Sequence, residues 1–473
     1  MSACEPDILP ALQETLRASG KAVPDVATLG CFLRALLVFP AGTPISCALA
    51  DGMIAEIDER LSEQLSLVLH HERFRSLETS WRSLQFLIER VDFRQNIVIQ
   101  YLSVSRDDLL ADLDDAPEVI LSGFYHHVYT AEYGQFGGQP VGAIVANYEF
   151  SASAPDIRLL TAAAAVAAMA HAPFLAGAGK NFFLIDSWEQ FAALEDFRTL
   201  FSMPYYARWR GFRDSEDARY AVLTLPCFLL RLPYTPENHA GNFAFRESRD
   251  ATDHLCWGNA SFALAERLAD SFAKYRWCAN IIGVEGGVVQ RLPLYTMSAY
   301  IAEERIPTQV LISEQREFDL AEEGFVALAM RKGMDDALFF SANSCQRGKT
   351  FGNASGDHAA DINYKLSSQL PYMMVMNRLA HYLKVLQREN VGAWKTRLVL
   401  EQELNKWINQ YVTEMDNPDP STRSRRPLRM AEVKVDDISD NPSWYRITIR
   451  ARPHFKFMGA NFTLSLTGKL DRE

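Results

Sequence analysis

Apolar residues recur at spacings of three and four along residues 54–91, which is the pattern of helices with one apolar side. The first run is Ile54, Ile57, Leu61, Leu65 and Val68. The second run is Phe74, Leu77, Trp81, Leu84, Ile88 and Val91. The pattern predicts a helical hairpin that breaks near His70-His71-Glu72, with both apolar stripes packed on the rest of the body.

Beyond residue 96, short apolar runs alternate with helical patterns. Strands are predicted over residues 96–104, 141–150, 181–186, 221–230, 309–312, 325–330 and 431–438. Helices are predicted after Ser105 and over residues 156–172, 188–197, 257–275 and 314–323, and two longer ones over residues 372–386 and 400–411. This alternation predicts an α/β (α+β) mixed-sheet body with long helices and C-terminal β-strands.

The C-terminal tail, Trp444 to Leu470, alternates apolar and polar residues with the period of two that is typical of strands. It predicts two strands joined across Arg-Pro-His and Met-Gly, after a polar linker that begins at Asp416. The candidate assembly residues are the large apolar side chains of these strands: Tyr445, Ile447, Ile449, Phe455, Phe457, Phe462, Leu464 and Leu466.

A two-stranded hairpin alone is marginally stable in water. Burial of each of these side chains would contribute roughly 1.5–3 kcal/mol as an upper estimate, which requires a second surface. The pattern leaves two surfaces open with equal weight, namely the domain of the same chain and a neighbouring chain.

The length of 473 residues predicts more than one domain. We expect an N-terminal arm over residues 1–50 and a body over residues 51–415 that divides into two subdomains. A linker over residues 416–430 and C-terminal strands for pairing between subunits over residues 431–473 complete the chain.

Composition narrows the class of protein. The chain is 48% hydrophobic, so it can bury a large interior, and its net charge of −11 argues against general nucleic-acid binding. The seven cysteines include no CxxC pair, which favours a reducing cytoplasm. The N-terminus lacks the apolar core of a signal peptide, and the apolar run over residues 159–178 is better explained as a buried helix than as a membrane span.

Several short motifs resemble catalytic or binding signatures but fail their spacing. Gly348-Lys349-Thr350 lacks the glycine that a phosphate-binding loop needs at position 343, which is Asn343. His70-His71-Glu72 does not form HExxH, and His126-His127 point apart on a predicted helix. We therefore expect no catalytic, cofactor or metal site.

Taken together, several stretches resemble one family, the large sheath subunit of type VI secretion systems, called TssC or VipB (the EvpB family). The resemblance covers about residues 55 to 470 and rests on LSEQLSLVLHHERFRSLETSWRSLQFLI (61–88), AEYGQFGGQPVGAIVANYEF (131–150), VAAMAHAPFLAGA (166–178), RDSEDARYAVLTLPCFLLRLPYT (213–235), WGNASFALAERLADSFAKYRWC (257–278), KLSSQLPYMMVMNRLAHYLKV (365–385), RRPLRMAEVKV (425–435) and RPHFKFMGANFTLSL (452–466). The chain departs from the family at Cys227, where the family usually has Arg, near Gly348, in the segment 452–460 and over the first 50 residues.

The resemblance implies a structural, phage-tail-sheath-like protein of the bacterial cytoplasm. Its implied partners are a small sheath subunit, neighbouring copies of itself, the Hcp inner tube, a membrane-anchored baseplate and, through the small subunit, a ClpV-type ATPase. Terminal strands of neighbouring subunits are expected to interlace. The alternatives are a sheath-derived accessory protein that does not polymerise and, motivated by Gly-Lys-Thr at 348–350, a cytoplasmic α/β nucleotide-binding enzyme.

Overall fold

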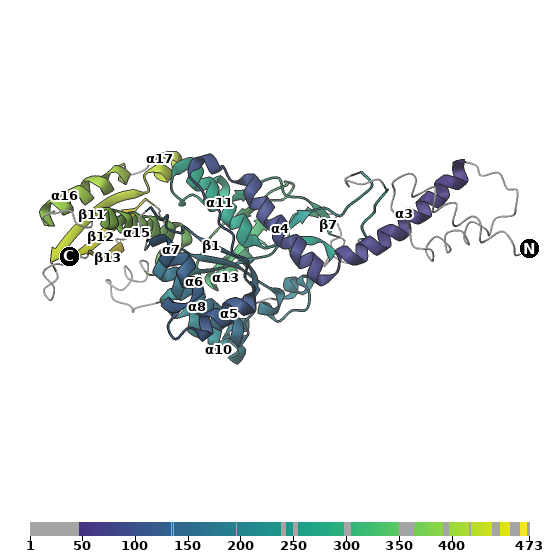
Figure 1. The fold of residues 1–473 in the computed structure, drawn as a ribbon, viewed down its shortest axis with the longest axis horizontal. Helices are drawn as coiled ribbons and strands as arrows, with labels where there is room; N and C mark the ends of the chain where they lie inside the picture. Colours follow the sequence, from purple (N-terminus) through teal and green to yellow (C-terminus); the bar gives the residue numbers. More distant parts are fainter. Residues whose placement is uncertain are drawn as a thin grey trace, which may run out of the picture. The chain divides into compact units, whose positions relative to one another are not determined.

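The structure is a computed structural model of the chain. It describes residues 47–133, 135, 137–194, 196–237, 243–248, 254–297, 304–349, 364, 366–390, 397–415, 418–437, 445–454 and 464–470. The chain divides into two compact units, and Figure 1 shows its elements. The first unit comprises Met1–Val68 with Tyr234–Ser248, and the second comprises Leu69–Pro233 with Arg249–Glu473.

The described part of the first unit is the helix α3 (Cys47–Leu69) with residues 234–237 and 243–248. Ser62 and Ser66 lie on the buried side of the helix. Their hydroxyl oxygens accept hydrogen bonds from the backbone N–H groups of Arg246 (3.2 Å) and Ser248 (3.1 Å). The small side chains thus allow an extended backbone to lie directly against the helix.

A six-stranded sheet forms the centre of the second unit, in the order β1-β2-β3-β9-β10-β6. Its strands are β1 (Ile144–Phe150), β2 (Phe174–Ala178), β3 (Ala221–Leu225), β9 (Phe325–Met330), β10 (Ala337–Phe339) and β6 (Val288–Val289). The first four are parallel, and β10 is antiparallel to both of its neighbours. The mixed sheet predicted from the sequence is confirmed.

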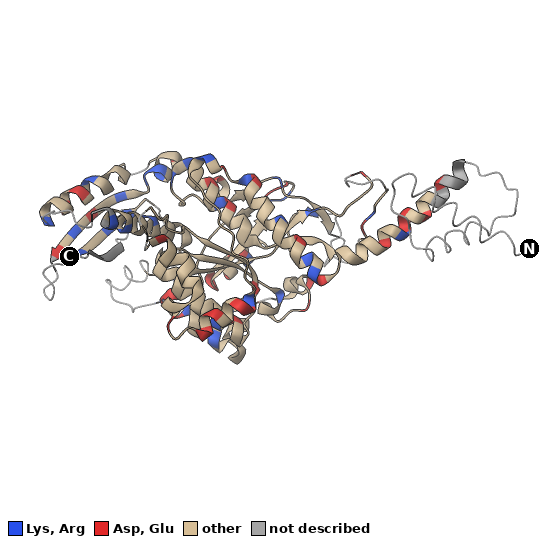
Figure 2. Cartoon of the chain, viewed as in Figure 1, with Lys and Arg blue, Asp and Glu red and all other residues tan. Residues whose placement is uncertain are grey.

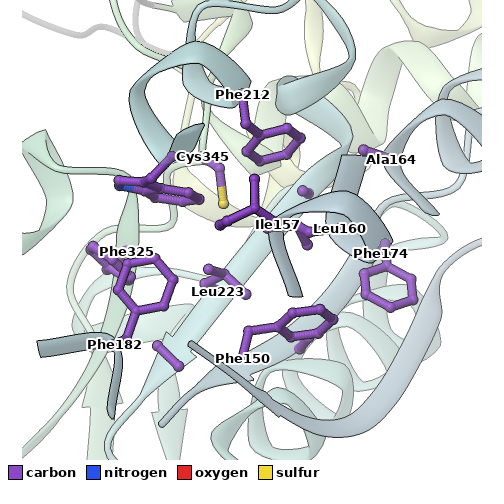
Figure 3. Packing of buried hydrophobic residues seen from close by; sticks show 14 of the residues in the cluster. Phe150, Ile157, Leu160, Ala164, Phe174, Phe182, Phe212, Leu223, Phe325 and Cys345 are labelled. Carbon is purple, nitrogen blue, oxygen red and sulfur yellow. The ribbon is translucent and has the colours of Figure 1, made fainter. Parts of the chain in front are cut away.

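Helices cover both faces of this sheet, because alternate side chains of each strand point to opposite sides. Leu223 belongs to the cluster under α8 (Ala154–Ala170), whereas Val222 belongs to the cluster under α11 (Ala260–Tyr275). Figure 1 shows α8 and α11 on opposite sides of the sheet that contains β1. Figure 3 shows the first cluster, in which Ile157 and Leu160 of α8 lie among side chains of the sheet.

Helix α8 illustrates how the sequence sets the ends of an element. The Ser153 hydroxyl accepts a hydrogen bond from the Asp156 N–H at the N-terminus, and Pro155 occupies the first turn. His171 ends the helix in the left-handed conformation (φ 51°), two residues before Pro173. The predicted helix over 156–172 is therefore confirmed.

Further elements complete the second unit. Its other helices in this region are α4 (Glu72–Arg90), α5 (Arg106–Asp115), α6 (Gly123–Tyr125), α7 (Ala131–Tyr133), α9 (Phe197–Ser202), α10 (Ala207–Arg213), α12 (Gly283–Gly286) and α13 (Glu314–Glu322). Short 3₁₀ or π segments span Phe93–Gln95, Val119–Leu121, His126–Thr130, Lys180–Phe183, Trp188–Ala193, Pro204–Tyr206, Asp217–Tyr220 and Asn409–Tyr411. Two small sheets pair β4 (Phe228–Arg231) with β5 (Cys256–Gly258) and β7 (Tyr295–Met297) with β8 (Glu304–Ile306).

Three predicted strands are wrong. Residues 181–186 lie in a 3₁₀ turn that ends at Leu184 in the left-handed conformation, and residues 309–312 form no strand. Asn96 is in the left-handed conformation, and residues 97–104 form no helix and belong to no sheet of the described chain. Short apolar runs do not distinguish a strand from a buried turn, because either can place such a run in the core, as the turn does with Phe182 and Phe183.

The C-terminal region consists of α15 (Leu370–Asn390), α16 (Arg397–Ile408), α17 (Pro420–Arg425) and a three-stranded antiparallel sheet. The sheet has the order β11-β12-β13, with β11 (Leu428–Asp437), β12 (Tyr445–Pro453) and β13 (Leu464–Leu470). A short helix, α17, lies within the predicted linker, because the Asp419 carboxylate caps it and Pro420 fits its first turn.

Candidate protein-interaction surfaces

Helix α4 exposes the apolar stripe that the sequence predicted to be buried. Phe74, Leu77 and Ile88 are exposed, and the Trp81 side chain is 57% exposed. The buried residues of the helix are instead Ser83 and Leu87. The prediction that this stripe packs on the body of the same chain is therefore wrong for these four residues, whereas Val91, the last residue of the stripe, is buried in the cluster under α11 as predicted.

The physical reason lies on the opposite side of α4, where small polar residues contact α11 and β5. The Ser80 hydroxyl accepts a hydrogen bond from the Asn147 amide of β1 at 2.9 Å, and the Thr79 hydroxyl lies 3.9 Å from the Cys256 sulfur. Small side chains permit close approach of the two backbones, and their hydroxyls are satisfied in the interface. Phe86 and Leu87 also pack on this side, against the cluster under α11. The large apolar side chains of the predicted stripe remain on the outer side of the helix.

An ion pair fixes this orientation of α4. Arg231 of β4 donates two hydrogen bonds to the Glu78 carboxylate, at 2.6 and 3.0 Å, and both side chains are largely buried. Burial raises the pKa of Glu78, but the hydrogen bonds and charges of Arg231 and Arg82 outweigh it and lower that pKa below its ordinary value. Glu78 therefore remains ionised and holds the helix with its apolar stripe outward.

The exposed stripe continues onto the segment that follows α4. The ring of Tyr101, which is exposed, lies 5.9 Å from the ring of Trp81. We use the name α4 surface for Phe74, Leu77, Trp81, Ile88 and Tyr101. Rows of large exposed apolar side chains mark interaction sites, and Figure 2 shows charges of both signs beside this row on α4.

Helix α3 has the same inverted pattern within the first unit. Ile54, Leu61 and Val68 are exposed, whereas Ser62 and Ser66 are buried. The sequence-based expectation that this stripe packs on the body is thus also wrong for these residues.

The tail residues lie in the three-stranded sheet. Ile447 and Ile449 of β12 are buried, opposite Val435 and Val433 of β11. They pack in a cluster with residues of α15 and α16: Leu379, Leu383, Leu400, Leu404 and Ile408. The apolar face of β12 is therefore covered by its own chain.

Three of the other candidate assembly residues also lie in strands of this sheet. Tyr445 is the first residue of β12, and Leu464 and Leu466 of β13 lie opposite Ala451 and Ile449. Phe455, Phe457 and Phe462 lie outside the described residues. Pairing of these strands with a neighbouring copy stays a prediction.

One edge of this sheet is covered by side chains of α16. The Asn405 amide accepts a hydrogen bond from the Val433 N–H (2.9 Å) and donates one to the Val433 carbonyl (2.7 Å). Glu401 accepts a hydrogen bond from the Val435 N–H (3.1 Å), and Arg397 donates one to the Val435 carbonyl (3.4 Å). These side chains replace the hydrogen bonds that a fourth strand would make, so β11 cannot accept another strand without displacing α16.

The sequence analysis did not predict that α16 covers the edge of β11, although the sequence contains a pattern that indicates it. Arg397, Glu401 and Asn405 recur at a spacing of four, on the helix face beside the buried Leu400 and Leu404. The opposite edge of the sheet, β13, pairs with no further strand among the described residues.

Groups that could carry chemistry do not gather at one site in the described part of the chain. Among residues whose placement is described, no three His, Cys, Asp or Glu side chains are grouped so that they could hold a metal ion. Lys349 lies with its ammonium 5.1 Å from the centre of the Tyr364 ring, while Thr350 lies outside the described residues. Burial raises the pKa of Cys256 to about 11 and of Cys345 to about 12, so neither thiol is activated as a nucleophile.

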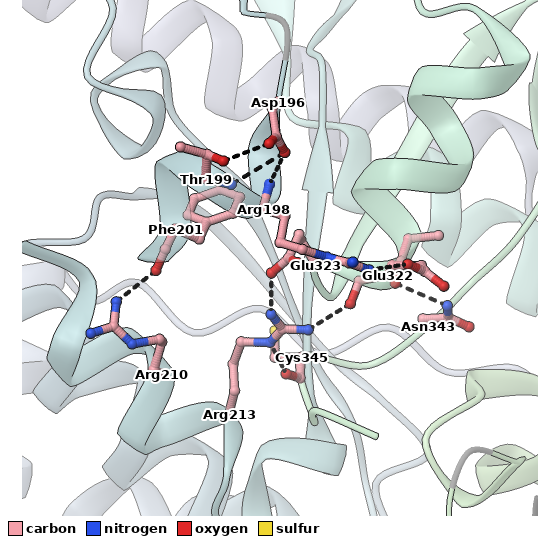
Figure 4. A network of polar contacts seen from close by, with 11 residues as sticks. Asp196, Arg198, Thr199, Phe201, Arg210, Arg213, Glu322, Glu323, Asn343 and Cys345 are labelled. Carbon is pink, nitrogen blue, oxygen red and sulfur yellow. Dashed lines mark hydrogen bonds and ion pairs between the residues drawn. The ribbon is translucent and has the colours of Figure 1, made fainter. Parts of the chain in front are cut away.

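A buried charge network joins three segments of the core. Figure 4 shows that the Arg213 guanidinium donates hydrogen bonds to the Cys345 carbonyl (3.1 Å), the Glu322 carbonyl (2.7 Å) and the Glu323 carboxylate. Each of the three guanidinium nitrogens thus donates to a partner within the chain, which is typical of a structural ion pair. Among the helices of the described chain, none is long and apolar enough to cross a membrane.

Comparisons with known proteins agree with an assembly role. Residues 51–346 match a family model described as EvpB/VC_A0108, tail sheath N-terminal domain, and residues 359–470 match its tail sheath gpW/gp25-like domain. The chain is similar to the type VI secretion system sheath protein TssC1 of Pseudomonas aeruginosa, with 36% identity over 429 residues, 89% of this chain and 85% of the relative. The chain therefore belongs to the EvpB (TssC/VipB) family of large sheath subunits of type VI secretion systems.

Proposed function

We propose that this chain pairs with a small sheath subunit and that the pairs polymerise around the Hcp inner tube as a contractile sheath. Membership of a sheath family implies a small partner subunit and self-assembly. The sheath would form in the bacterial cytoplasm on a membrane-anchored baseplate, propel the inner tube on contraction, and be recycled by a ClpV-type ATPase that grips the small subunit.

The observation that carries the proposal is the outward apolar row of the α4 surface. Each large side chain that a partner covers there would contribute roughly 1.5–3 kcal/mol as an upper estimate. Such a row is costly on a chain that works alone, because it favours aggregation. A permanent small subunit that covers the α4 surface accounts for it.

The C-terminal sheet supplies a second contact, to a neighbouring copy. Because α16 covers β11, a strand from a neighbour would add at β13. Since β12 packs on α15 and α16, the part that stays joined to a neighbour would be the whole gpW/gp25-like domain, residues 359–470, and not a free ribbon.

In this proposal the chain is a structural protein and not an enzyme. The work of contraction would come from the difference in free energy between the extended and contracted lattices. An accessory protein that pairs with the small subunit without polymerising is the alternative, and a nucleotide-binding enzyme is disfavoured because the Gly-Lys-Thr motif lacks its first glycine.

Co-expression with the small sheath subunit tests the proposal. We expect long hollow tubes in electron micrographs. A stable pair that never forms tubes would favour the accessory protein, and two chains that elute separately would refute the sheath role. Protection against thermal unfolding by millimolar nucleotide would instead support the enzyme.

A further inference from the structure

Residues 97–104, Ile97-Val-Ile-Gln-Tyr-Leu-Ser-Val104, have the composition of a strand but pair with none. β-branched and aromatic residues dominate the segment, and it contains no charged residue, glycine or proline. Ile97 and Ile99 pack on the cluster under α11, while Val98 and Leu102 are exposed. One side of residues 97–100 is therefore anchored and the other faces outward, while residues 101–103 are exposed.

The backbone of this segment is unpaired. Within the described chain, residues 97–104 make no hydrogen bond between backbone groups. The one hydrogen bond to this backbone comes from a side chain, since the Tyr148 hydroxyl donates to the Val104 carbonyl at 2.8 Å. Burial alternates over residues 97–100 as it does along a strand, and an unpaired backbone that carries apolar side chains in this way is a template for strand addition.

The segment also contacts the edge strand of the central sheet, β1. Tyr148 belongs to β1, the outermost strand, whose outer edge pairs with no strand among the described residues. The contact between Tyr148 and Val104 therefore joins the unpaired segment to an open sheet edge.

The position of the segment identifies its partner. Tyr101 is part of the segment and part of the α4 surface, because its ring contacts Trp81. A protein that covers Trp81 must also cover the segment beside it. We infer that residues 97–103 bind a β-strand of the small sheath subunit, so that the interface combines strand pairing with burial of the α4 surface. This inference rests on the proposed function, and the partner strand should be uncharged where it faces Val98 and Tyr101.

Amide hydrogen exchange measures the pairing directly. The purified chain is compared with the complex that it forms with the small subunit. In the complex, every second amide of residues 97–103 should exchange at least about tenfold more slowly, because only alternate N–H groups of a strand face one neighbour. Unchanged exchange in a verified complex would overturn the inference and leave the sheath function intact.

Proline substitutions give an independent test. Gln100 and Ser103 have opposite parity along the segment, so their N–H groups point to opposite sides. Of Gln100→Pro and Ser103→Pro, one should abolish the complex and the other should be tolerated, since proline is accepted where the N–H faces away from a partner. Gln100→Ala and Ser103→Ala are the matched controls and should form tubes.

Neither proline should lower the unfolding temperature of the chain alone, because these N–H groups have no partner within it. Tubes from both proline variants would overturn strand pairing. Failure of the unsubstituted chain to form any complex would overturn the proposed function and this inference with it.

Discussion

At the scale of single residues, the most informative difference between sequence pattern and structure is that serines, and not the large apolar residues, lie on the buried sides of α3 and α4. Ser62, Ser66 and Ser83 are buried where the periodicity placed the apolar side chains. Periodicity identifies which residues share a helix face but not which face the same chain covers. In a subunit of an assembly, a partner can cover the face that the chain itself leaves exposed.

Replacement of the buried Arg213 should strongly destabilise the folded chain. Arg213→Met leaves the largely buried Glu323 carboxylate and two carbonyls without a partner, so we expect the free energy of unfolding to fall by about 3–5 kcal/mol. Urea denaturation measures the change. Arg198→Met is the matched control, because its ion pair with Glu322 is exposed and should contribute little; equal losses for the two variants would contradict the role of burial.

Two partly buried histidines should make the chain sensitive to acid. Burial lowers the pKa of His171 to about 3 and of His381 to about 4, and the His381 ring donates to the Ala170 carbonyl at 2.9 Å. The unfolded chain therefore binds more protons than the folded chain from about pH 6.5 downward, so stability is lost as the pH falls toward 4. Each histidine adds a slope of at most about 1.4 kcal/mol per pH unit.

The variant His381→Gln should flatten this dependence in urea denaturation between pH 6.5 and 4. His126→Gln is the control, since its side chain is exposed and its replacement should leave the slope unchanged. An identical slope in the unsubstituted chain and in His381→Gln would show that another group governs the acid response.

At the scale of elements, the long and strongly patterned segments were predictable and the short ones were not. The sequence predicted α8, α11, α13 and the two long C-terminal helices, as well as β1, β3 and β9. It predicted one strand over 221–230, which the structure divides into β3 and β4 at Pro226, where no N–H is available for a ladder. For the tail it predicted the strands but left open whether their own domain covers them.

The cover of β11 by α16 gives a prediction at this scale. Asn405→Leu removes the partners of the Val433 N–H and carbonyl, and we expect a loss of about 1–3 kcal/mol together with self-association through the opened edge. Urea denaturation and sedimentation measure the two effects. Gln402→Leu, on the exposed side of the same helix, should change neither stability nor self-association. If Asn405→Leu also changed neither quantity, the edge of β11 would not need the cover that α16 provides.

The α4 surface gives a second prediction at the scale of elements. The double variant Leu77→Ser and Trp81→Ser should lose binding to the small subunit by at least about 100-fold, as expected when two large apolar side chains leave an interface. The chain itself should unfold at the same temperature, because both side chains are exposed. Gln85→Ser on the same helix is the control for binding, and a double variant that still binds would place the interface elsewhere.

At the scale of the whole molecule, the mixed sheet and the family were predictable because they rest on many stretches in a fixed order. The surfaces for assembly were not, because an exposed helix stripe and a buried one have the same sequence pattern. The unpaired segment 97–104 is an example, since it was predicted as a strand and has no ladder in the single chain.

Truncation separates assembly from folding. Deletion of residues 464–473 removes β13 but leaves Ile447 and Ile449 packed on α15 and α16, so the chain should still bind the small subunit and fail to form tubes. Deletion of residues 445–473 also uncovers Val433 and Val435 and should lower the unfolding temperature. Electron microscopy and circular dichroism measure the two outcomes, and long tubes from the shorter deletion would exclude β13 as the joint.

The unequal edges of the C-terminal sheet have a practical consequence. One side is occupied by α16, and the outer side of β13 pairs with no strand in the described part of the chain. A short synthetic peptide that binds along β13 would therefore occupy the place of the next copy and offer no site for another. Such a peptide would act as a chain terminator, shortening the average tube in proportion to its dose without dissolving tubes that are already complete.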